Sequence, residues 1–162
     1  MKRILAGPNV IMEALRASPR SIEVILIADS LRPMSMKQIE DAARRAQVEV
    51  EETSRMLLDR LTPGIPNQGT VAITGSYPYI DFDTLISIGE KQCDPLVVVL
   101  DQVQDPRNLG AVIRSSYAFG AIGIIMPKDR SAPINAAAVR ASAGASELIK
   151  TVRVTNLART MD

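Results

Sequence analysis

The sequence predicts an α/β protein in which a small N-terminal αβ domain precedes the start of a parallel sheet. Two observations predict this class. In the first half, short β-rich apolar runs alternate with segments of helical period, whereas residues 96–100 (LVVVL) are apolar throughout. An uninterrupted apolar run suits a parallel strand that is covered on both faces. Since 162 residues suffice for two small domains, we expect domains at residues 1–78 and 95–162, separated by a linker at residues 79–94.

The first half supplies three expected strands and three expected helices. The strands are expected at residues 22–28, 48–50 and 70–74, and the helices at residues 8–16, 36–46 and 54–61. Pro8 suits the first turn of a helix, where its missing N–H leaves no hydrogen bond unmade. Apolar residues three or four apart indicate the helical period. Pro63 and Gly64 end the third helix.

A strand, a helix and another strand are expected to follow in the second half. Asp105 is a good N-cap and Pro106 is favoured at the first helical position, so a helix begins there. Its apolar stripe comprises Leu109, Val112, Ile113 and Tyr117, and Gly120 is a natural helix end. With the apolar strand at residues 122–126, these elements form a right-handed βαβ unit. The remaining elements are expected at residues 135–141 (helix), 151–154 (strand) and from Asn156 (helix).

The chain ends soon after this last helix begins. An open α/β sheet normally has more strands than the three apolar ones that we expect after residue 95. We therefore interpret the sequence as a truncated chain.

The composition excludes several classes of site. The chain has no histidine, and Cys93 is its only cysteine, so we expect no Ser-His machinery, no internal disulfide and no metal site. Nineteen basic residues and eighteen acidic ones leave a net charge of +1, so any RNA contact must use a local patch. The sequence shows neither a secretory signal pattern nor a run of membrane-spanning length, and we expect a cytoplasmic protein.

The helix that begins at Pro106 carries the residues with the clearest chemical meaning. It follows the carboxyl end of a buried strand, where ligands bind in open α/β sheets. Arg107, Gly110 and Arg114 are expected to share one face, so that an arginine stands beside a gap left by small residues. Such a guanidinium suits a phosphate, which it can bind with two parallel hydrogen bonds. The structural explanations are a solvated charge for Arg114, a capping role for Asn108 and close packing for Gly110.

Residues 100–127 contain the pattern D-P-x-N-x-G, followed by I-R-[ST], an aromatic residue, F-G and a short apolar strand. This pattern resembles the first motif of the SpoU/TrmH family of RNA 2′-O-ribose methyltransferases. The matching residues are Asp105, Pro106, Asn108, Gly110, Ile113, Arg114 and Gly120. Residues 7–15 (GPNVIMEAL), 59–72 (DRLTPGIPNQGTVA) and 141–147 (ASAGASE) resemble segments of the ribosomal-RNA branch of that family. Asn67 stands where that branch usually has histidine.

The resemblance implies an L30e-like RNA-binding domain and the first part of an α/β-knot (SPOUT), Rossmann-like methyltransferase domain, which normally dimerises. It implies S-adenosylmethionine as cofactor and RNA as partner, with methylation of a guanosine ribose in large-subunit ribosomal RNA. The family's cofactor-binding motifs are expected beyond Asp162, so this chain alone is expected to be inactive. Arg114 would position a phosphate and stabilise the developing 2′-alkoxide, and Asn108 would orient the RNA or Arg114.

The resemblance also implies residues that bind RNA around a Pro/Gly-rich loop. The expected RNA-binding residues are Arg55, Arg60, Asn67, Gln68 and Arg107. Glu147 is a possible further site residue, although a lone glutamate near a helix end is usually solvated, and Arg140 is expected to be a surface charge. The alternative function is a non-catalytic L30e-like RNA-binding protein, and a weaker alternative is a small-molecule-binding α/β domain.

Overall fold

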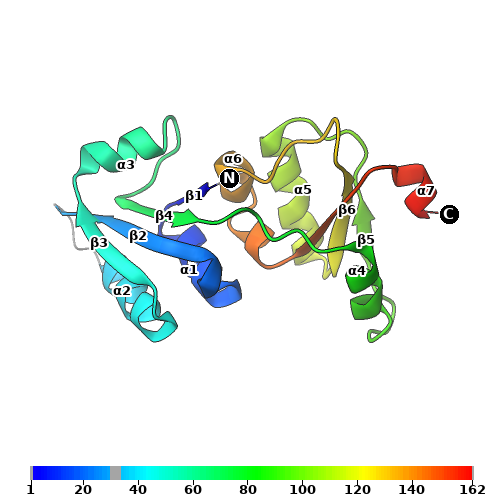
Figure 1. The fold of residues 1–162 in the computed structure, drawn as a ribbon, viewed down its shortest axis with the longest axis horizontal. Helices are drawn as coiled ribbons and strands as arrows, with labels where there is room; N and C mark the ends of the chain where they lie inside the picture. Colours follow the sequence, from blue (N-terminus) through cyan, green and yellow to red (C-terminus); the bar gives the residue numbers. More distant parts are fainter. Residues whose placement is uncertain (1, 30–33, 162) are drawn as a thin grey trace.

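Two β-sheets, one in each half of the chain, organise the fold (Figure 1). The structure is a computed structural model, and it describes residues 2–29 and 34–161. The first sheet consists of β1 (Arg3–Ala6), β4 (Thr70–Thr74), β2 (Ile22–Ala28) and β3 (Glu49–Thr53), in that spatial order. β2 and β3 run parallel, while β4 pairs antiparallel with both β1 and β2.

Helices cover both faces of this first sheet, and alternation along β2 explains why. The helices of this half are α1 (Pro8–Ala17), the short 3₁₀ helix η1 (Pro19–Ser21), α2 (Met34–Ala46) and α3 (Arg55–Leu61). Ile25 and Ile27 pack in a core with α1 and α2, whereas Leu26 and Ala28 pack with Leu58 of α3. Successive side chains of a strand point to opposite faces, so an unbroken apolar run buries both faces.

The second sheet is parallel and is also covered on both faces. Its strands, in spatial order, are β5 (Val97–Val99), β6 (Gly123–Pro127) and β7 (Lys150–Val154). Its helices are α4 (Phe82–Gly89), α5 (Pro106–Ala118), α6 (Ala136–Ala141), η2 (Ala145–Glu147) and α7 (Leu157–Met161). Ile124 of β6 packs in a core with Leu109 and Ile113 of α5, while Ile125 packs with Leu85 of α4. The βαβ unit expected from the sequence is therefore present as β5-α5-β6.

The expected α/β class is confirmed, and the differences from expectation are local. The sequence analysis missed β1, and it placed Tyr117 in the apolar stripe of α5, although that side chain is 46% exposed. Residues 79–94, expected as a linker, contain α4, and Ile80 forms a parallel bridge with Val152 of β7. This segment therefore packs on the second sheet, because its apolar residues bury a face that the sheet would otherwise expose.

A buried ion pair joins the two halves where α6 and η2 meet β1 (Figure 1). Arg3 Nη1 and Nη2 lie 2.5 and 3.0 Å from the two carboxylate oxygens of Glu147, and the two side chains are 6% and 2% exposed. The Arg3 guanidinium lies 5.0 Å from the ring centre of Tyr77, whose hydroxyl donates a hydrogen bond to Ser146 O at 2.6 Å. Burial raises the pKa of the Tyr77 hydroxyl well above its usual range, so it remains a donor at neutral pH.

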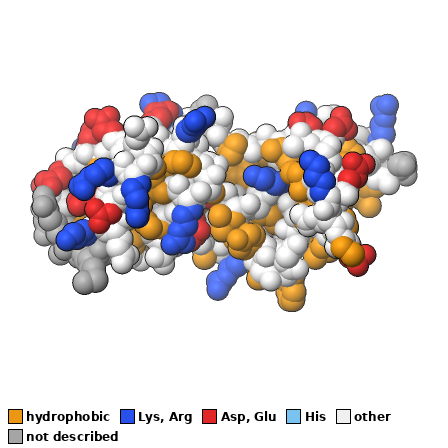
Figure 2. All heavy atoms as spheres, turned by 90° about the horizontal axis from the view of Figure 1, so that it is seen from below, with side chains coloured by type: hydrophobic (Ala, Val, Ile, Leu, Met, Phe, Trp, Pro, Cys, Tyr) orange, Lys and Arg blue, Asp and Glu red, His pale blue; other side chains and the backbone are white. Residues whose placement is uncertain are grey.

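Charges of both signs are spread over the surface. Seen from below, basic and acidic side chains are interspersed over the first half, while hydrophobic side chains gather over the middle and the second half (Figure 2). Exposed large apolar side chains of the second half include Ile86, Leu96, Tyr117 and Phe119. Within the described residues, no helix is long and apolar enough to cross a membrane, and no three His, Cys, Asp or Glu side chains gather as metal ligands.

Candidate RNA interface

The first turn of α5 presents polar side chains to solvent. The Asp105 carboxylate caps the helix, because it accepts hydrogen bonds from the backbone nitrogens of Arg107 (2.6 Å) and Asn108 (3.2 Å). Pro106 occupies the first helical position, as the sequence predicted. Leu109 turns into the core, and the side chains of Arg107 and Asn108 remain exposed.

Arg114 lies two turns further along α5 and is also exposed. Residues seven apart lie on nearly the same side of a helix, so Arg114 follows Arg107 along one edge of α5. Among the described residues, the side chains of Arg107, Asn108 and Arg114 have no hydrogen-bond or ion-pair partner. This edge of α5 therefore offers two guanidinium groups and one amide that are free to bind a ligand.

Gly110 does not leave the gap beside Arg114 that the sequence analysis expected. A Cβ at Gly110 would lie 2.4 Å from Ala138 O and 2.5 Å from Ala141 Cβ, and both of these atoms belong to α6. The glycine therefore lets α5 and α6 pack closely, which was the structural explanation. The expected gap is absent because a helix that follows later in the chain fills it.

A hollow of about 390 Å³ lies between the loop that follows α3 and the facing surfaces of α5 and α6. It is lined by Gly64, Ile65, Pro66, Arg107, Ala137, Arg140 and Ala141. Arg140 is exposed, as expected, but its Nη1 also donates a hydrogen bond to Pro66 O at 3.0 Å. Both halves of the chain thus form this hollow, and Arg107 connects it to the exposed edge of α5.

Asn67 shapes the loop after α3 from the inside. Its side chain donates hydrogen bonds from Nδ2 to Asp59 Oδ1 and to Thr62 Oγ1, and its Oδ1 accepts one from Gly69 N, all at 2.9 Å. Since Asn67 is only 1% exposed, its side chain is not available to RNA, contrary to the sequence-based prediction. Its role is to position the loop, and its neighbour Gln68 is the exposed residue there.

The two arginines of α3 are exposed on the same long edge of the molecule as the start of α5 (Figure 1). Arg55 Nε lies 3.6 Å from Asp59 Oδ1, an exposed ion pair one helical turn long. Arg60 has no ion-pair partner among the described residues. Neither arginine lines the hollow at α5 and α6.

Glu147 is not a solvated or ligand-binding carboxylate. Both of its oxygens face Arg3, and the side chain is 2% exposed. It therefore joins the two halves and does not reach the surface on which Arg114 lies. The sequence gave no sign of this partner, because the two residues are 144 positions apart.

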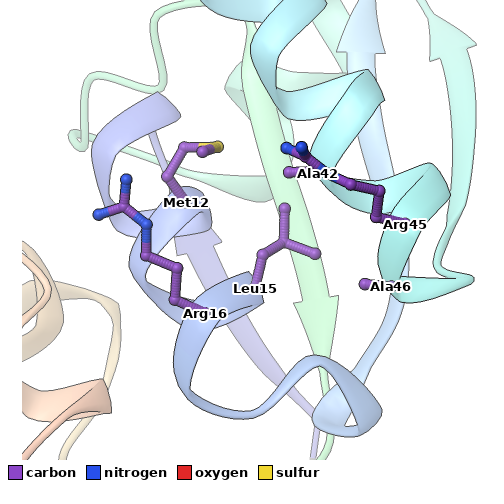
Figure 3. A pocket seen from close by; sticks show the side chains of 6 residues that line it. All are labelled: Met12, Leu15, Arg16, Ala42, Arg45 and Ala46. Atoms are coloured by element: carbon purple, nitrogen blue, oxygen red, sulfur yellow. The ribbon is translucent and has the colours of Figure 1, made fainter.

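A separate hollow of about 340 Å³ lies between α1 and α2 (Figure 3). It is lined by Met12, Leu15, Arg16, Ala42, Arg45 and Ala46, whose side chains come from the two helices (Figure 3). No residue predicted to act in catalysis or RNA binding lies in it, and it is not part of the candidate interface.

Two family profiles match the chain, one in each half. Residues 4–80 match the profile described as RNA 2′-O ribose methyltransferase substrate binding, and residues 95–162 match the SpoU rRNA Methylase family. The chain belongs to the SpoU/TrmH family. Within this SpoU-type chain, the hollow lies where the two matched regions meet, since Pro66 belongs to the first and Arg140 to the second.

Named relatives and solved structures agree with membership of the SpoU family. YacO of Bacillus subtilis (strain 168), assigned by its name to the TrmH family of tRNA/rRNA methyltransferases, is 34% identical over 96% of this chain and 62% of YacO. The crystal structure of the SpoU methyltransferase AviRb from Streptomyces viridochromogenes with AdoMet is 25% identical, with a TM-score of 0.79 over 99% of this chain and 58% of that one. An rRNA methyltransferase from Sinorhizobium meliloti has a TM-score of 0.75 at 25% identity, over 94% of this chain and 54% of that one.

The second sheet was tested for a place that could hold the methyl donor of a SpoU enzyme. Two hollows lie near its strands, one lined by Pro95, Val97 and Ile122 among others, and one by Gly120, Ile122 and Lys150 among others. These residues lie at the amino-terminal ends of the strands, whereas open α/β sheets bind ligands at the carboxyl ends. These hollows do not fit the donor, so the chemistry derived below concerns only the RNA side.

Changing Asn67 to aspartate is expected to destabilise this SpoU-family chain by at least about 2 kcal/mol. The change removes both hydrogen-bond donors of the buried amide and places a carboxylate against Asp59. Urea denaturation followed by circular dichroism measures the free energy of unfolding. The matched control is Gln68→Glu, the same chemical change at an exposed neighbour, which should stay within about 0.5 kcal/mol of the unchanged protein. Equal stability of the two variants would contradict the positioning role.

Proposed function

We propose that this protein acts in S-adenosylmethionine-dependent 2′-O-methylation of RNA, and that residues 1–162 supply the surface that holds the RNA. The proposed substrate is a guanosine ribose of large-subunit ribosomal RNA. The support comes from the match of both halves to the SpoU family and from the named relatives, which include an rRNA methyltransferase and a SpoU methyltransferase crystallised with AdoMet.

The exposed edge of α5 is the observation that carries this proposal. Arg107, Asn108 and Arg114 lie there without side-chain partners among the described residues, at the end of the helix that follows the carboxyl end of β5. An unpaired guanidinium matches a phosphate with two parallel hydrogen bonds, so two such groups along one edge suit the backbone of RNA. A protein that only binds a small molecule has no need of this row of cations.

The proposed role of Arg114 is electrostatic. A guanidinium has a pKa above about 12, so it does not accept the proton of the ribose 2′-hydroxyl at neutral pH. It instead holds a phosphate of the RNA and stabilises the negative charge that develops on the 2′-oxygen. Asn108, one turn and a half earlier on α5, would orient the RNA beside it. The donor supplies the methyl group, and the proton leaves to another acceptor.

The proposal extends to the surroundings of the protein. We propose that it works as a homodimer in the cytoplasm, and that the apolar side chains exposed on the second half supply a contact between copies. Phe119, at the end of α5, is 82% exposed, and Tyr117 is 46% exposed. Sedimentation of the purified chain measures the association, and a strictly monomeric chain at micromolar concentration would count against it.

A pair of titrations tests the function. Fluorescence anisotropy with a labelled fragment of large-subunit ribosomal RNA should show binding that weakens steeply with salt. Arg107→Ala combined with Arg114→Ala should weaken it by about tenfold or more, since a hydrogen bond to a charged group contributes about 1.5–3 kcal/mol. Calorimetry of the same chain with S-adenosylmethionine should show no micromolar binding, because the hollows near the second sheet do not fit the donor.

The matched control removes two other exposed arginines, Arg20 and Arg44, from the first half. It changes the net charge by the same amount and should leave most of the RNA affinity in place. Equal losses in the two double variants would show that the edge of α5 is not a specific RNA contact. Micromolar binding of S-adenosylmethionine would overturn the proposal that residues 1–162 supply only the RNA side.

A further inference from the structure

We propose that the hollow between the loop after α3 and helices α5 and α6 binds one ribose–phosphate unit of single-stranded RNA, with Arg140 and Arg107 holding its phosphate. This inference rests on the proposed function and adds a second contact point to it. Arg140 was expected only as a surface charge, and its place in the hollow became visible only in the structure.

The size and walls of the hollow suit a single nucleotide. Its volume is about 390 Å³, near the lower end of the range of about 300–1,000 Å³ found for small-ligand sites. Gly64, Ile65 and Pro66 of the first half form one wall, and α5 and α6 form the other. A ligand in this position would contact both halves of the chain at once.

The charged groups of the hollow can hold a phosphate. Arg140 uses one N–H for Pro66 O at 3.0 Å, and a guanidinium has five N–H donors, so others remain for a ligand. Arg107, on the opposite helix, has no side-chain partner among the described residues. The lining contains two guanidinium groups and no carboxylate. An anion placed between them would therefore meet donors from two helices and no like charge.

The uncharged part of the lining favours a sugar over a stacked base. It is formed by Ile65, Pro66, Ala137 and Ala141, and no aromatic side chain lines the hollow. Base recognition in single strands normally uses stacking on aromatic rings. Ala137 and Ala141 are also the reason why space is left, since a larger side chain at either position would occupy it.

The test is fluorescence anisotropy of labelled single-stranded RNA with the chain and two variants of α6, repeated over a salt series. Arg140→Ala should weaken RNA binding by about tenfold and lower the slope of log affinity against log salt by about one, because one phosphate contact is lost. Ala137→Phe should weaken binding by a similar factor without changing the slope, because it fills the hollow and leaves the charges in place.

The matched controls are Arg44→Ala and Ala118→Phe, which make the same chemical changes at exposed sites away from the hollow. Both should bind RNA nearly as the unchanged chain does, and thermal unfolding of all four variants confirms that they are folded. If Arg140→Ala proves unstable, Arg140→Lys replaces it, and this variant should keep the slope but lose affinity with the two-pronged geometry.

The outcomes separate this inference from the proposed function. Normal RNA binding by both Arg140→Ala and Ala137→Phe, together with weak binding by the Arg107 and Arg114 variant, would overturn the hollow as a nucleotide site and leave the proposed function standing. Absence of RNA binding by the unchanged chain would overturn both. Loss in Arg140→Ala alone, with Ala137→Phe normal, would overturn the seat in the hollow, because RNA would then contact Arg140 from outside.

Discussion

Glu147→Gln is expected to lower the free energy of unfolding by about 3–5 kcal/mol, the usual cost of leaving one member of a buried ion pair without its partner. The change leaves the Arg3 guanidinium buried, 6% exposed, opposite a neutral amide. Urea denaturation followed by circular dichroism measures the loss. The two halves should also separate more easily, because the pair links β1 of the first sheet to η2 of the second half.

The control for this prediction is a second Glu–Arg pair in the same chain. Glu13 Oε1 lies 2.8 Å from Arg16 Nη1, but these side chains are 26% and 66% exposed. Glu13→Gln should therefore cost less than about 1 kcal/mol. A similar small loss for Glu147→Gln would mean that the buried pair does not hold the halves together.

The double variant Arg3→Met with Glu147→Leu should recover much of the stability that Glu147→Gln loses. Apolar residues of similar volume often replace a buried ion pair without loss, since the cost of removing two charges from water disappears. Arg3 Nε is buried without a hydrogen-bond partner among the described residues, which adds to that cost. RNA binding by the double variant would then show whether the pair is needed only for stability or also for the placement of the two halves.

Gly110→Leu is expected to destabilise the second half by more than about 3 kcal/mol, the upper end of ordinary overpacking. Even the first side-chain carbon would lie 2.4 Å from Ala138 O and 2.9 Å from Ser142 N, and backbone atoms cannot turn aside as a flexible side chain can. In an open helix, replacing glycine with alanine gains about 1 kcal/mol. Gly110→Ala should nevertheless destabilise, because the contact with α6 outweighs that gain.

Thermal unfolding of the Gly110 variants should be compared with that of Gly75→Ala. A Cβ at Gly75 meets nothing within 4 Å, so this control carries the same change without the contact. Its free energy of unfolding should stay within about 0.5 kcal/mol of the unchanged protein. Stability of Gly110→Leu equal to that of the control would show that α5 and α6 can move apart without cost, and the glycine would need another explanation.

This prediction also bears on the SpoU motif in α5. Asp105 and Gly110 are explained by helix capping and by helix packing, without any ligand. Arg107, Asn108 and Arg114 have no such structural explanation, since their side chains are exposed and lack partners among the described residues. The motif therefore combines residues that build the helix with residues that remain for the RNA.

The sequence by itself determined the elements whose signals are local. The Asp105–Pro106 helix start, the alternation along β2 and the apolar run of β5 depend on neighbours a few positions away, and these predictions held. The edge of α5 that carries Arg107 and Arg114 also follows from helical spacing alone. The resemblance to the SpoU family was visible for the same reason, because its motif is contiguous.

Only the tertiary structure decided which of these residues meet. Arg3 and Glu147 are 144 positions apart, and Arg140 and Pro66 are 74 apart, so no local pattern predicts either contact. Burial gave Asn67 and Glu147 structural roles in place of the functional ones expected for them. A polar side chain looks the same in the sequence whether it faces RNA or a buried partner, and its surroundings depend on how the two sheets pack against each other.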